Sequence, residues 1–133
     1  YLKDRDVIFY FYPKDNTPGC TSAGRDFTEH LDEFENLGVE VFGISKDSVS
    51  SHEKFCKKQG FKHQLLSDEG LFCDACGVIQ EKKMYGKTYL GIVRTTFFIQ
   101  NGIITKIWQN VRVKNHVNEV LSVIRPILKG GNQ

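Results

Sequence analysis

The residue in this sequence best placed to do chemistry is Cys20, which follows a short loop that contains two prolines and a glycine. The apolar and aromatic run at 6–11 predicts a buried strand before this loop, and apolar residues at helical spacing predict a helix from about 20 to 37 after it. The N-terminus of a helix favours negative charge and lowers the pKa of a cysteine thiol from its usual value of about 8.5. We therefore identify Cys20 as a candidate nucleophile.

Composition narrows the class of protein. The chain has 133 residues and a formal net charge of +2, which is too small to imply binding to nucleic acid or to a membrane surface. No apolar run approaches the roughly 20 residues that span a bilayer, and no signal peptide is visible. Four cysteines in a chain long enough to build its own core favour reactive thiols over a structural disulfide framework. We therefore expect a cytoplasmic protein with no nucleic-acid or membrane partner.

Apolar patterning predicts an α/β fold in a single domain, residues 1–133. The apolar run at 39–45 follows Gly38 and completes a strand–helix–strand unit, which implies parallel strands joined by a right-handed crossover. The later elements are expected as a helix from Asp47 or Ser48 to Gly60, a short strand at 64–67, a short helix from Asp68 through Cys76, an irregular segment at 77–91, a hairpin at 93–109 that turns at Asn101 and Gly102, and a last helix capped by Asn115 that Pro126 ends or kinks.

The residues around Cys20 also carry a resemblance to a known family. The run from Phe11 to Cys20, Phe-Tyr-Pro-Lys-Asp-Asn-Thr-Pro-Gly-Cys, resembles the peroxidatic-cysteine signature of peroxiredoxins, in particular of the PrxQ or bacterioferritin-comigratory subgroup. The likeness extends from Tyr10 to about Leu128. It implies a thioredoxin-like sandwich, with a central mixed β-sheet flanked by helices, and it implies that the family's N-terminal hairpin is missing ahead of this segment.

The resemblance further implies a thiol-dependent peroxidase that reduces hydrogen peroxide and alkyl hydroperoxides, with no cofactor and no metal. In this reaction a thiolate attacks one peroxide oxygen, and fixed hydrogen-bond donors stabilise the leaving oxygen. Candidate groups are the backbone N–H groups next to Cys20, the Thr17 hydroxyl, and Arg94, which matches the family's arginine. Arg94 also begins an otherwise apolar strand, where a charge is rarely buried without a partner. The alternative is an edge arginine paired with a carboxylate.

Pro18 and Gly19 are the residues expected to contact the substrate beside Cys20. Pro18 fixes its own backbone φ, which would keep the loop rigid and the thiolate shielded. Plainer interpretations exist for two of these neighbours. Proline is common in the first turn of a helix, and Thr17 could serve as a helix N-cap.

A sulfenic acid at Cys20 needs a second thiol. Many PrxQ-type sequences carry that resolving cysteine five residues further on, but position 25 here is Arg25. In another arrangement of the subgroup the cysteine lies on the next helix, and the segment 51–61 is similar to that helix. Cys56 is therefore the first candidate and Cys73 the second. The alternative for Cys56 is an ordinary thiol on the apolar face of its helix.

Cys73 and Cys76 form a CxxC motif without the preceding buried strand of a thioredoxin-type dithiol and without further ligands for zinc, so we expect no metal site. A peroxidase resolved through Cys56 would be recycled by thioredoxin or a similar dithiol, and the family implies a monomer or weak dimer. Two alternatives stay open. One is a one-cysteine peroxidase resolved by an external thiol, and the other is a thiol–disulfide exchange module without peroxidase activity.

Overall fold

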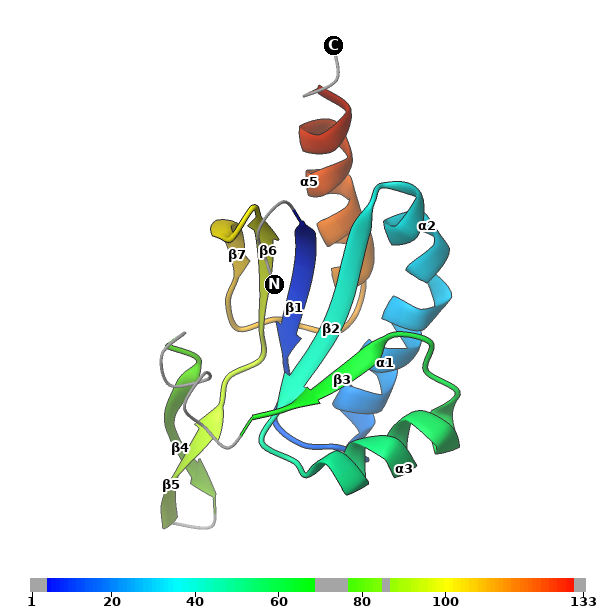
Figure 1. The fold of residues 1–133 in the computed structure, drawn as a ribbon. Coiled ribbons are helices and arrows are strands. Elements are labelled where there is room, and N and C mark those ends of the chain that lie inside the picture. Colours follow the sequence, from blue (N-terminus) through cyan, green and yellow to red (C-terminus); the bar gives the residue numbers. More distant parts are fainter. Residues whose placement is uncertain (1–4, 69–76, 85–86, 131–133) are drawn as a thin grey trace.

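The computed structural model describes residues 5–68, 77–84 and 87–130 (Figure 1). Its elements follow in the order β1 (Asp6–Phe11), α1 (Pro18–Glu29), α2 (Leu31–Asn36), β2 (Val39–Ser45), α3 (Val49–Gln59), β3 (Gln64–Ser67), β4 (Ile79–Met84), β5 (Lys87–Ile92), β6 (Thr95–Gln100), β7 (Ile103–Trp108) and α5 (His116–Gly130).

Five strands form one mixed sheet in the order β3-β2-β1-β6-β7. Strand β1 pairs in parallel with β2, which pairs in parallel with β3, so the predicted strand–helix–strand unit is confirmed. On its other side β1 pairs antiparallel with β6, and β6 pairs antiparallel with β7. Phe9 illustrates the central position of β1, because it lies opposite Phe42 on one neighbour and Phe97 on the other.

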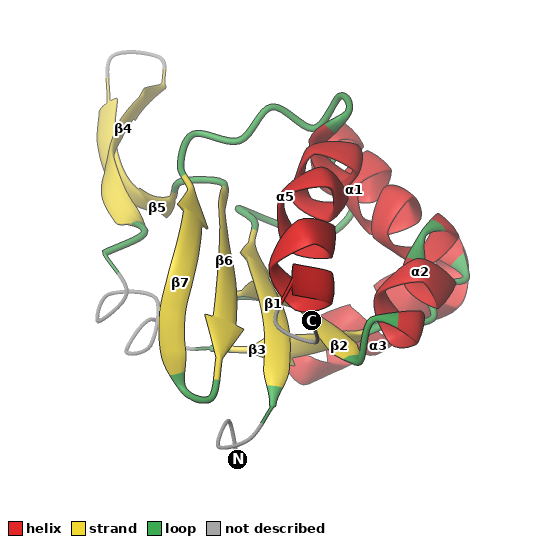
Figure 2. Ribbon diagram, turned by 90° about the horizontal axis from the view of Figure 1, so that it is seen from above, coloured by secondary structure: helices red, strands yellow, loops and turns green. Residues whose placement is uncertain are grey.

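The side chains of β1 alternate between two cores, which explains why this strand is apolar from Val7 to Phe11. Ile8 and Tyr10 face a cluster that contains residues from all four described helices, and Cys20 belongs to the same cluster. Val7 and Phe9 face a second cluster on the opposite side, which includes Val78 and Ile92 from the ends of the β4–β5 region. Figure 2 shows the helices gathered on one side of the five-stranded sheet and the β4–β5 hairpin standing away from them.

Two expectations about secondary structure were wrong, and a third was wrong in one of its two alternatives. The helix expected at 20–37 begins at Pro18 and breaks at His30 (φ −99°, ψ 9°), which re-aims α2 so that its Leu31 and Phe34 are buried in the core. The segment expected to be irregular at 77–91 contains the antiparallel strands β4 and β5. These strands pair only with each other, and their lysines obscure the apolar pattern that marks the strands of the main sheet. Pro126 was expected to end or kink the last helix, and it does not end α5, which continues to Gly130. Pro126 is exposed, so water can satisfy the carbonyl that loses its N–H partner.

Several turn and cap predictions are confirmed. Asn101 and Gly102 both have positive φ (52° and 80°), as a type I′ turn requires between β6 and β7. The Ser48 side chain accepts a hydrogen bond from the Ser51 N–H at the start of α3, and Gly60 ends that helix with φ 71°. The short helix expected from Asp68 through Cys76 lies largely outside the described residues.

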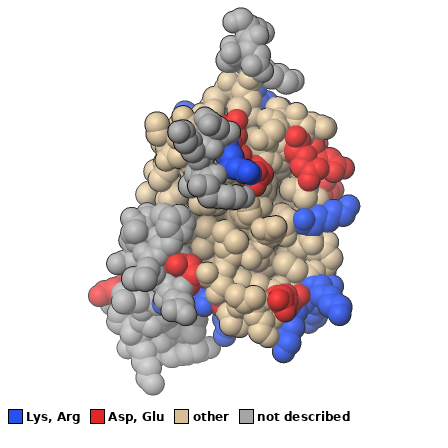
Figure 3. Space-filling model, in the orientation of Figure 1, with Lys and Arg blue, Asp and Glu red and all other residues tan. Residues whose placement is uncertain are grey.

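Charged side chains of both signs share the face drawn in Figure 3. Acidic residues occupy the first turn of α2, and Lys57 and Lys58 occupy the last turn of α3, an arrangement that complements the helix dipoles. Within the described ranges, no helix has the length and apolar character needed to cross a membrane.

Candidate active site

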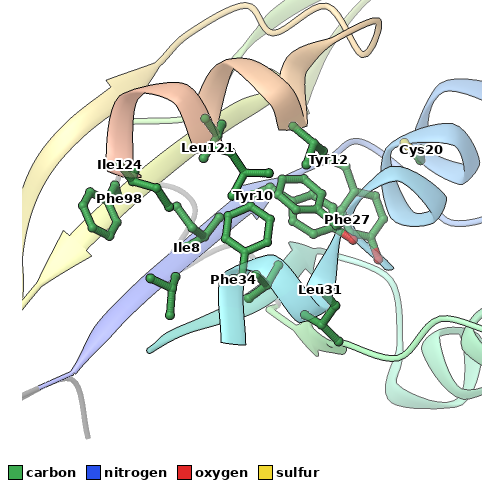
Figure 4. Close-up of a cluster of buried hydrophobic side chains, with 14 of the residues drawn as sticks. Ile8, Tyr10, Tyr12, Cys20, Phe27, Leu31, Phe34, Phe98, Leu121 and Ile124 are labelled. Atoms are coloured by element: carbon green, nitrogen blue, oxygen red, sulfur yellow. The ribbon is translucent and has the colours of Figure 1, made fainter. Parts of the chain in front are cut away.

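Cys20 sits in the first turn of α1, where the chain turns from the sheet into the helix. Thr17 is the N-cap, with extended backbone (φ −91°, ψ 152°), and Pro18 opens the helix. The Thr21 N–H donates to the Thr17 carbonyl at 2.9 Å, which closes the first helical turn around the cysteine. The thiol is 2% exposed and lies at one end of the helix-side core cluster (Figure 4).

Thr17 takes the N-cap position that the plainer interpretation expected, but its side chain makes no capping hydrogen bond. Its hydroxyl instead donates to the Lys14 carbonyl at 2.8 Å, within the loop. The hydroxyl proton is therefore used in this hydrogen bond, and the Thr17 oxygen can only accept a further one. Pro18 is exposed and Thr17 is half-buried, so these residues form the outer rim of the turn that holds Cys20.

Arg94 reaches the cysteine from a distant part of the sequence. It lies between β5 and β6 rather than in a strand, and its Nη2 donates to the Cys20 Sγ at 3.4 Å. Its carbonyl accepts a hydrogen bond from the Val111 N–H at 2.9 Å, and the Val93 N–H donates to the Val78 carbonyl at 2.7 Å. These backbone bonds fix the position of the segment that carries the guanidinium. The described side-chain contact of Arg94 is with the Cys20 thiol and not with a carboxylate.

The second terminal nitrogen of Arg94, Nη1, is buried and has no hydrogen-bond partner among the described residues. A buried hydrogen-bond donor without a partner lowers the stability of the folded protein by about 1–3 kcal/mol, and a charged donor lowers it by more. The guanidinium fork thus places one donor on the sulfur and keeps a second donor beside it for an acceptor. That is the arrangement a bound oxygen ligand would complete.

Gly19 makes the close approach of Arg94 possible. A Cβ atom at position 19 would lie 3.0 Å from the Arg94 Nη2, which is tighter than ordinary van der Waals contact. Any larger residue here would push the guanidinium away from the sulfur. The glycine is therefore explained by packing around the thiol.

A buried polar cluster lies behind the cysteine loop, and the sequence analysis did not identify it. The Tyr12 hydroxyl donates to Asp15 Oδ1 at 2.6 Å, the Ser51 hydroxyl donates to Asp15 Oδ2 at 2.7 Å, and His52 Nδ1 lies 2.8 Å from the same Oδ2. Tyr12, Asp15 and His52 are each less than 5% exposed. Burial alone would raise the pKa of Asp15, but hydrogen bonds from His52, Tyr12 and Ser51 outweigh it, so the pKa is lowered.

Cys56 lies on α3, four residues after His52, and is partly buried. Burial raises the pKa of its thiol, and the negative charge of Asp15 raises it further. Cys20 and Cys56 are both free thiols. Burial raises the pKa of Tyr10, and the charges of Cys56 and then Cys20 raise it further, so both sulfurs lie within electrostatic range of the same phenol.

A second polar cluster joins α1 to the segment before β3. The Tyr10 hydroxyl and His63 Nε2 are 2.6 Å apart, and His63 Nδ1 lies 3.1 Å from the Thr28 hydroxyl. Burial lowers the pKa of His63 to about 4, so the imidazole is neutral at physiological pH.

Cys73 and Cys76 lie outside the described residues, so the second candidate for the resolving thiol stays a prediction. Among residues 5–68, 77–84 and 87–130, no group of three or more histidine, cysteine or acidic side chains is arranged to hold a metal ion.

Comparison with known proteins agrees with this geometry. The model of the AhpC/TSA family matches residues 1–107. Peroxiredoxin Bcp of Xanthomonas campestris is 47% identical over 121 residues, which cover 90% of this chain and 76% of that protein. Peroxiredoxin Bcp of Bacillus subtilis is 41% identical over 125 residues, which cover 92% of this chain and 80% of that protein.

A solved structure of the Xanthomonas campestris bacterioferritin comigratory protein, studied for its alkyl peroxide reduction activity, superposes with a TM-score of 0.90. The two sequences are 43% identical, and the match covers 96% of this chain and 82% of the other. The expected thioredoxin-like α/β fold is thereby confirmed.

The chain therefore belongs to the AhpC/TSA family, and within it to the peroxiredoxins of the PrxQ or bacterioferritin-comigratory subgroup. Peroxiredoxins are thiol-dependent peroxidases, so this protein is an enzyme that reduces peroxides with a cysteine thiol and draws electrons from a thiol reductant.

Proposed function

We propose that this enzyme reduces hydrogen peroxide and alkyl hydroperoxides at Cys20, resolves the resulting sulfenic acid with Cys56 as an intramolecular disulfide, and is recycled by thioredoxin or a similar dithiol. The observation that carries the proposal is the Arg94 guanidinium, which has one nitrogen on the Cys20 sulfur and a second, buried nitrogen without a partner among the described residues.

In the first step the Cys20 thiolate attacks the terminal peroxide oxygen. The S–O bond forms as the O–O bond breaks, the sulfur is oxidised to a sulfenic acid, and the leaving oxygen departs as an alkoxide or hydroxide that takes up a proton. Arg94 donates to the sulfur and, through Nη1, to a peroxide oxygen as negative charge develops on it. Thr17 accepts a hydrogen bond from the peroxide O–H, because its own proton is held by Lys14.

Pro18 and Gly19 shape the site in this step. Pro18 suits the first turn of α1, where its missing N–H costs nothing, and the fixed φ holds the turn in place. Gly19 leaves the space through which Arg94 reaches the sulfur. The peroxide therefore binds between the first turn of α1 and the Arg94 guanidinium.

In the second step the Cys56 thiolate attacks the sulfenic sulfur of Cys20. The S–S bond forms as the S–O bond breaks, and the leaving hydroxide takes up the proton that the Cys56 thiol released, which gives water. A dithiol reductant then restores both thiols by two successive exchanges. One observation on a relative supports this pairing. Structures of the Xanthomonas campestris protein carry serine in place of cysteine at two positions, and the separation of those positions equals that of Cys20 and Cys56.

The test is turnover coupled to thioredoxin and its reductase, with hydrogen peroxide or an alkyl hydroperoxide as substrate. Cys20→Ser should abolish peroxide consumption. Cys56→Ser should leave single-turnover oxidation of Cys20 intact and remove thioredoxin-supported turnover. Equal turnover of the unmodified protein and of Cys56→Ser would establish a one-cysteine mechanism resolved by an external thiol, and wild-type turnover in Cys20→Ser would exclude the whole proposal.

The cellular compartment that we propose for the enzyme follows from its thiol chemistry. Free thiols at positions 20 and 56 suit a reducing compartment such as the cytoplasm. We also propose a monomer or weak dimer, which sedimentation velocity over a range of protein concentrations would test.

A further inference from the structure

A stripe of lysines runs along α3 beside Cys56. Lys54, Lys57 and Lys58 are spaced at i, i+3 and i+4, so they share one face of the helix, and all three are exposed. We call these three residues the lysine stripe. None of them forms an ion pair with another residue of the described ranges. Lys57 and Lys58 follow Cys56 directly in the sequence, so they stay close to its sulfur in every redox form of the chain.

Positive charge is concentrated on this helix. α3 holds three lysines and a single acidic residue, Glu53, so its surplus of positive charge equals the formal net charge of +2 of the whole chain. The charged side chains outside α3 therefore cancel in number. Figure 3 shows basic side chains gathered at the lower right, in the region of α3. Such a surface attracts a partner with an acidic rim and speeds their encounter, and salt weakens the effect because it screens the charges.

The lysine stripe borders a groove that gives access to Cys56. Val49, Cys56 and Lys57 of α3 line a broad groove of about 560 Å³ together with Leu65 of β3. Val49 is 62% exposed, so an apolar side chain lies uncovered beside the thiol. Cys20, in contrast, is 2% exposed. A protein that docks on this part of α3 therefore approaches the Cys56 sulfur and not the Cys20 sulfur.

The two sulfurs of a Cys20–Cys56 disulfide also differ as leaving groups. Attack on the Cys56 sulfur expels Cys20 as a thiolate, which Arg94 stabilises through the Nη2 donor that contacts this sulfur. Attack on the Cys20 sulfur expels Cys56, and burial and the charge of Asp15 raise the pKa of the Cys56 thiol. A better stabilised thiolate leaves faster. Access and chemistry thus favour the same point of attack, the Cys56 sulfur.

We propose that the lysine stripe is a docking surface for a dithiol protein with an acidic rim, and that it brings the thiolate of this reductant to the Cys56 sulfur. The inference rests on the proposed Cys20–Cys56 disulfide. In the first exchange the reductant's thiolate attacks Cys56, a mixed disulfide forms, and Cys20 leaves as a thiolate. In the second exchange the reductant's other thiolate attacks the reductant sulfur of the mixed disulfide, and Cys56 leaves and takes up a proton. The reductant departs as a disulfide, and two electrons have passed to the enzyme.

Charge reversal in the stripe should slow the reduction of the enzyme and leave the peroxide step unchanged. In Lys57→Glu we expect the second-order rate constant for reduction by a thioredoxin of acidic isoelectric point to fall roughly fivefold at about 0.01 M salt, and by less than about 1.5-fold at about 1 M salt. Oxidation of Cys20 by hydrogen peroxide should stay within about twofold, because this substrate carries no charge. Dithiothreitol, which is small and uncharged, should reduce the variant and the unmodified protein at the same rate.

The chain offers two matched controls. Lys106→Glu makes the same change of charge on exposed β7, which lies at the opposite edge of the five-stranded sheet from β3, the strand that α3 packs against. Its reduction by thioredoxin should stay within about twofold of the unmodified rate. Glu53→Lys makes the opposite change of charge within the groove, so it should speed reduction at low salt.

The experiment oxidises the full chain with one equivalent of hydrogen peroxide, mixes it with reduced thioredoxin, and follows the loss of the Cys20–Cys56 disulfide by mass spectrometry after rapid quenching. A second thioredoxin, with serine in place of its second active-site cysteine, traps the mixed disulfide. Peptide mapping of the trapped complex shows which cysteine of the enzyme is joined to thioredoxin, and we expect Cys56.

A salt-dependent loss in Lys57→Glu that is absent from Lys106→Glu, with the mixed disulfide on Cys56, supports the proposal. An equal loss in Lys106→Glu would overturn it, because net charge and not the stripe would then set the rate. Unchanged reduction of Lys57→Glu at low salt, or a mixed disulfide on Cys20, would overturn it as well.

Two other results point elsewhere. Salt-dependent reduction by glutathione, with reduction by thioredoxin insensitive to salt, would assign the stripe to a small anionic thiol and overturn the docking of a protein. An unmodified protein that forms no Cys20–Cys56 disulfide would overturn the resolving role of Cys56 itself, so failure of the proposed function is distinguishable from failure of this inference.

Discussion

Replacement of Arg94 is the perturbation whose effect can best be worked out from the structure. The guanidinium has one nitrogen 3.4 Å from the Cys20 sulfur and a second, buried nitrogen without a partner among the described residues. Removal of one preorganised donor to a developing oxyanion costs about 2.7–4 kcal/mol, or roughly 10²–10³ in rate. Arg94→Met removes both donors and the charge, so we expect the second-order rate constant for Cys20 oxidation to fall by about 10³.

The companion variant Arg94→Lys separates charge from geometry. Lysine keeps the positive charge but is a single point donor, so it cannot hold the sulfur and a peroxide oxygen with two fixed nitrogens. We expect it to recover about a tenth of the lost rate or less. The assay is single-turnover oxidation of reduced protein at several peroxide concentrations. Arg125→Met is the control, because Arg125 makes an exposed ion pair with Glu33 far along the chain from Cys20.

The reasoning is refuted if Arg94→Lys oxidises within about threefold of the unmodified rate, since the paired donors would then be irrelevant. It is also refuted if Arg94→Met slows thioredoxin-dependent recycling while Cys20 oxidation keeps its rate. That result would place the guanidinium in the resolving or reducing steps.

Three further outcomes follow from the geometry. Gly19→Ala places a Cβ atom 3.0 Å from the Arg94 nitrogen, so single-turnover oxidation should slow roughly tenfold with little change in the urea midpoint. Because the pKa of Asp15 is lowered in the folded protein, its contribution to stability is present above its ordinary pKa of about 4 and is lost as pH falls through the folded value; Asp15→Asn should flatten the urea midpoint against pH in that acid range. Burial lowers the pKa of His63 to about 4, so stability should fall as pH drops from about 6.5 to 4, and His63→Gln should reduce that slope.

Local signals in the sequence were sufficient for the elements that flank the site. Proline and glycine mark the turn before Cys20, and Asn101 with Gly102 marks the β6–β7 hairpin. These residues act through the φ angles of a few neighbouring positions, so they can be interpreted without knowledge of the rest of the chain. The position of the candidate nucleophile at the first turn of a helix follows from the same local logic.

Contacts between segments that are distant in the sequence could not be predicted from such local signals. The sheet order brings Arg94 next to Cys20, 74 residues away, and only the family resemblance indicated the match. Asp15 and His52 were missed because a single polar residue within a loop or an apolar pattern gives no sign of its partner. The one clue was the place of His52 on the apolar face of α3, where a buried histidine needs hydrogen bonds on both nitrogens.

The β4–β5 hairpin was missed for a related reason. Its strands pair only with each other and not with the main sheet, so their sequence lacks the continuous apolar character that marks β1. Lysines at 82 and 83 made the segment resemble a solvated loop.

The central claim is that Cys20 is oxidised by peroxide and is resolved by Cys56. The most direct measurement is non-reducing peptide mapping by mass spectrometry after one equivalent of hydrogen peroxide. We predict a crosslink between the peptides that contain Cys20 and Cys56. A crosslink from Cys20 to Cys73 or Cys76 would contradict the resolving assignment, and a Cys20 that stays reduced while Cys73 pairs with Cys76 would contradict the account as a whole.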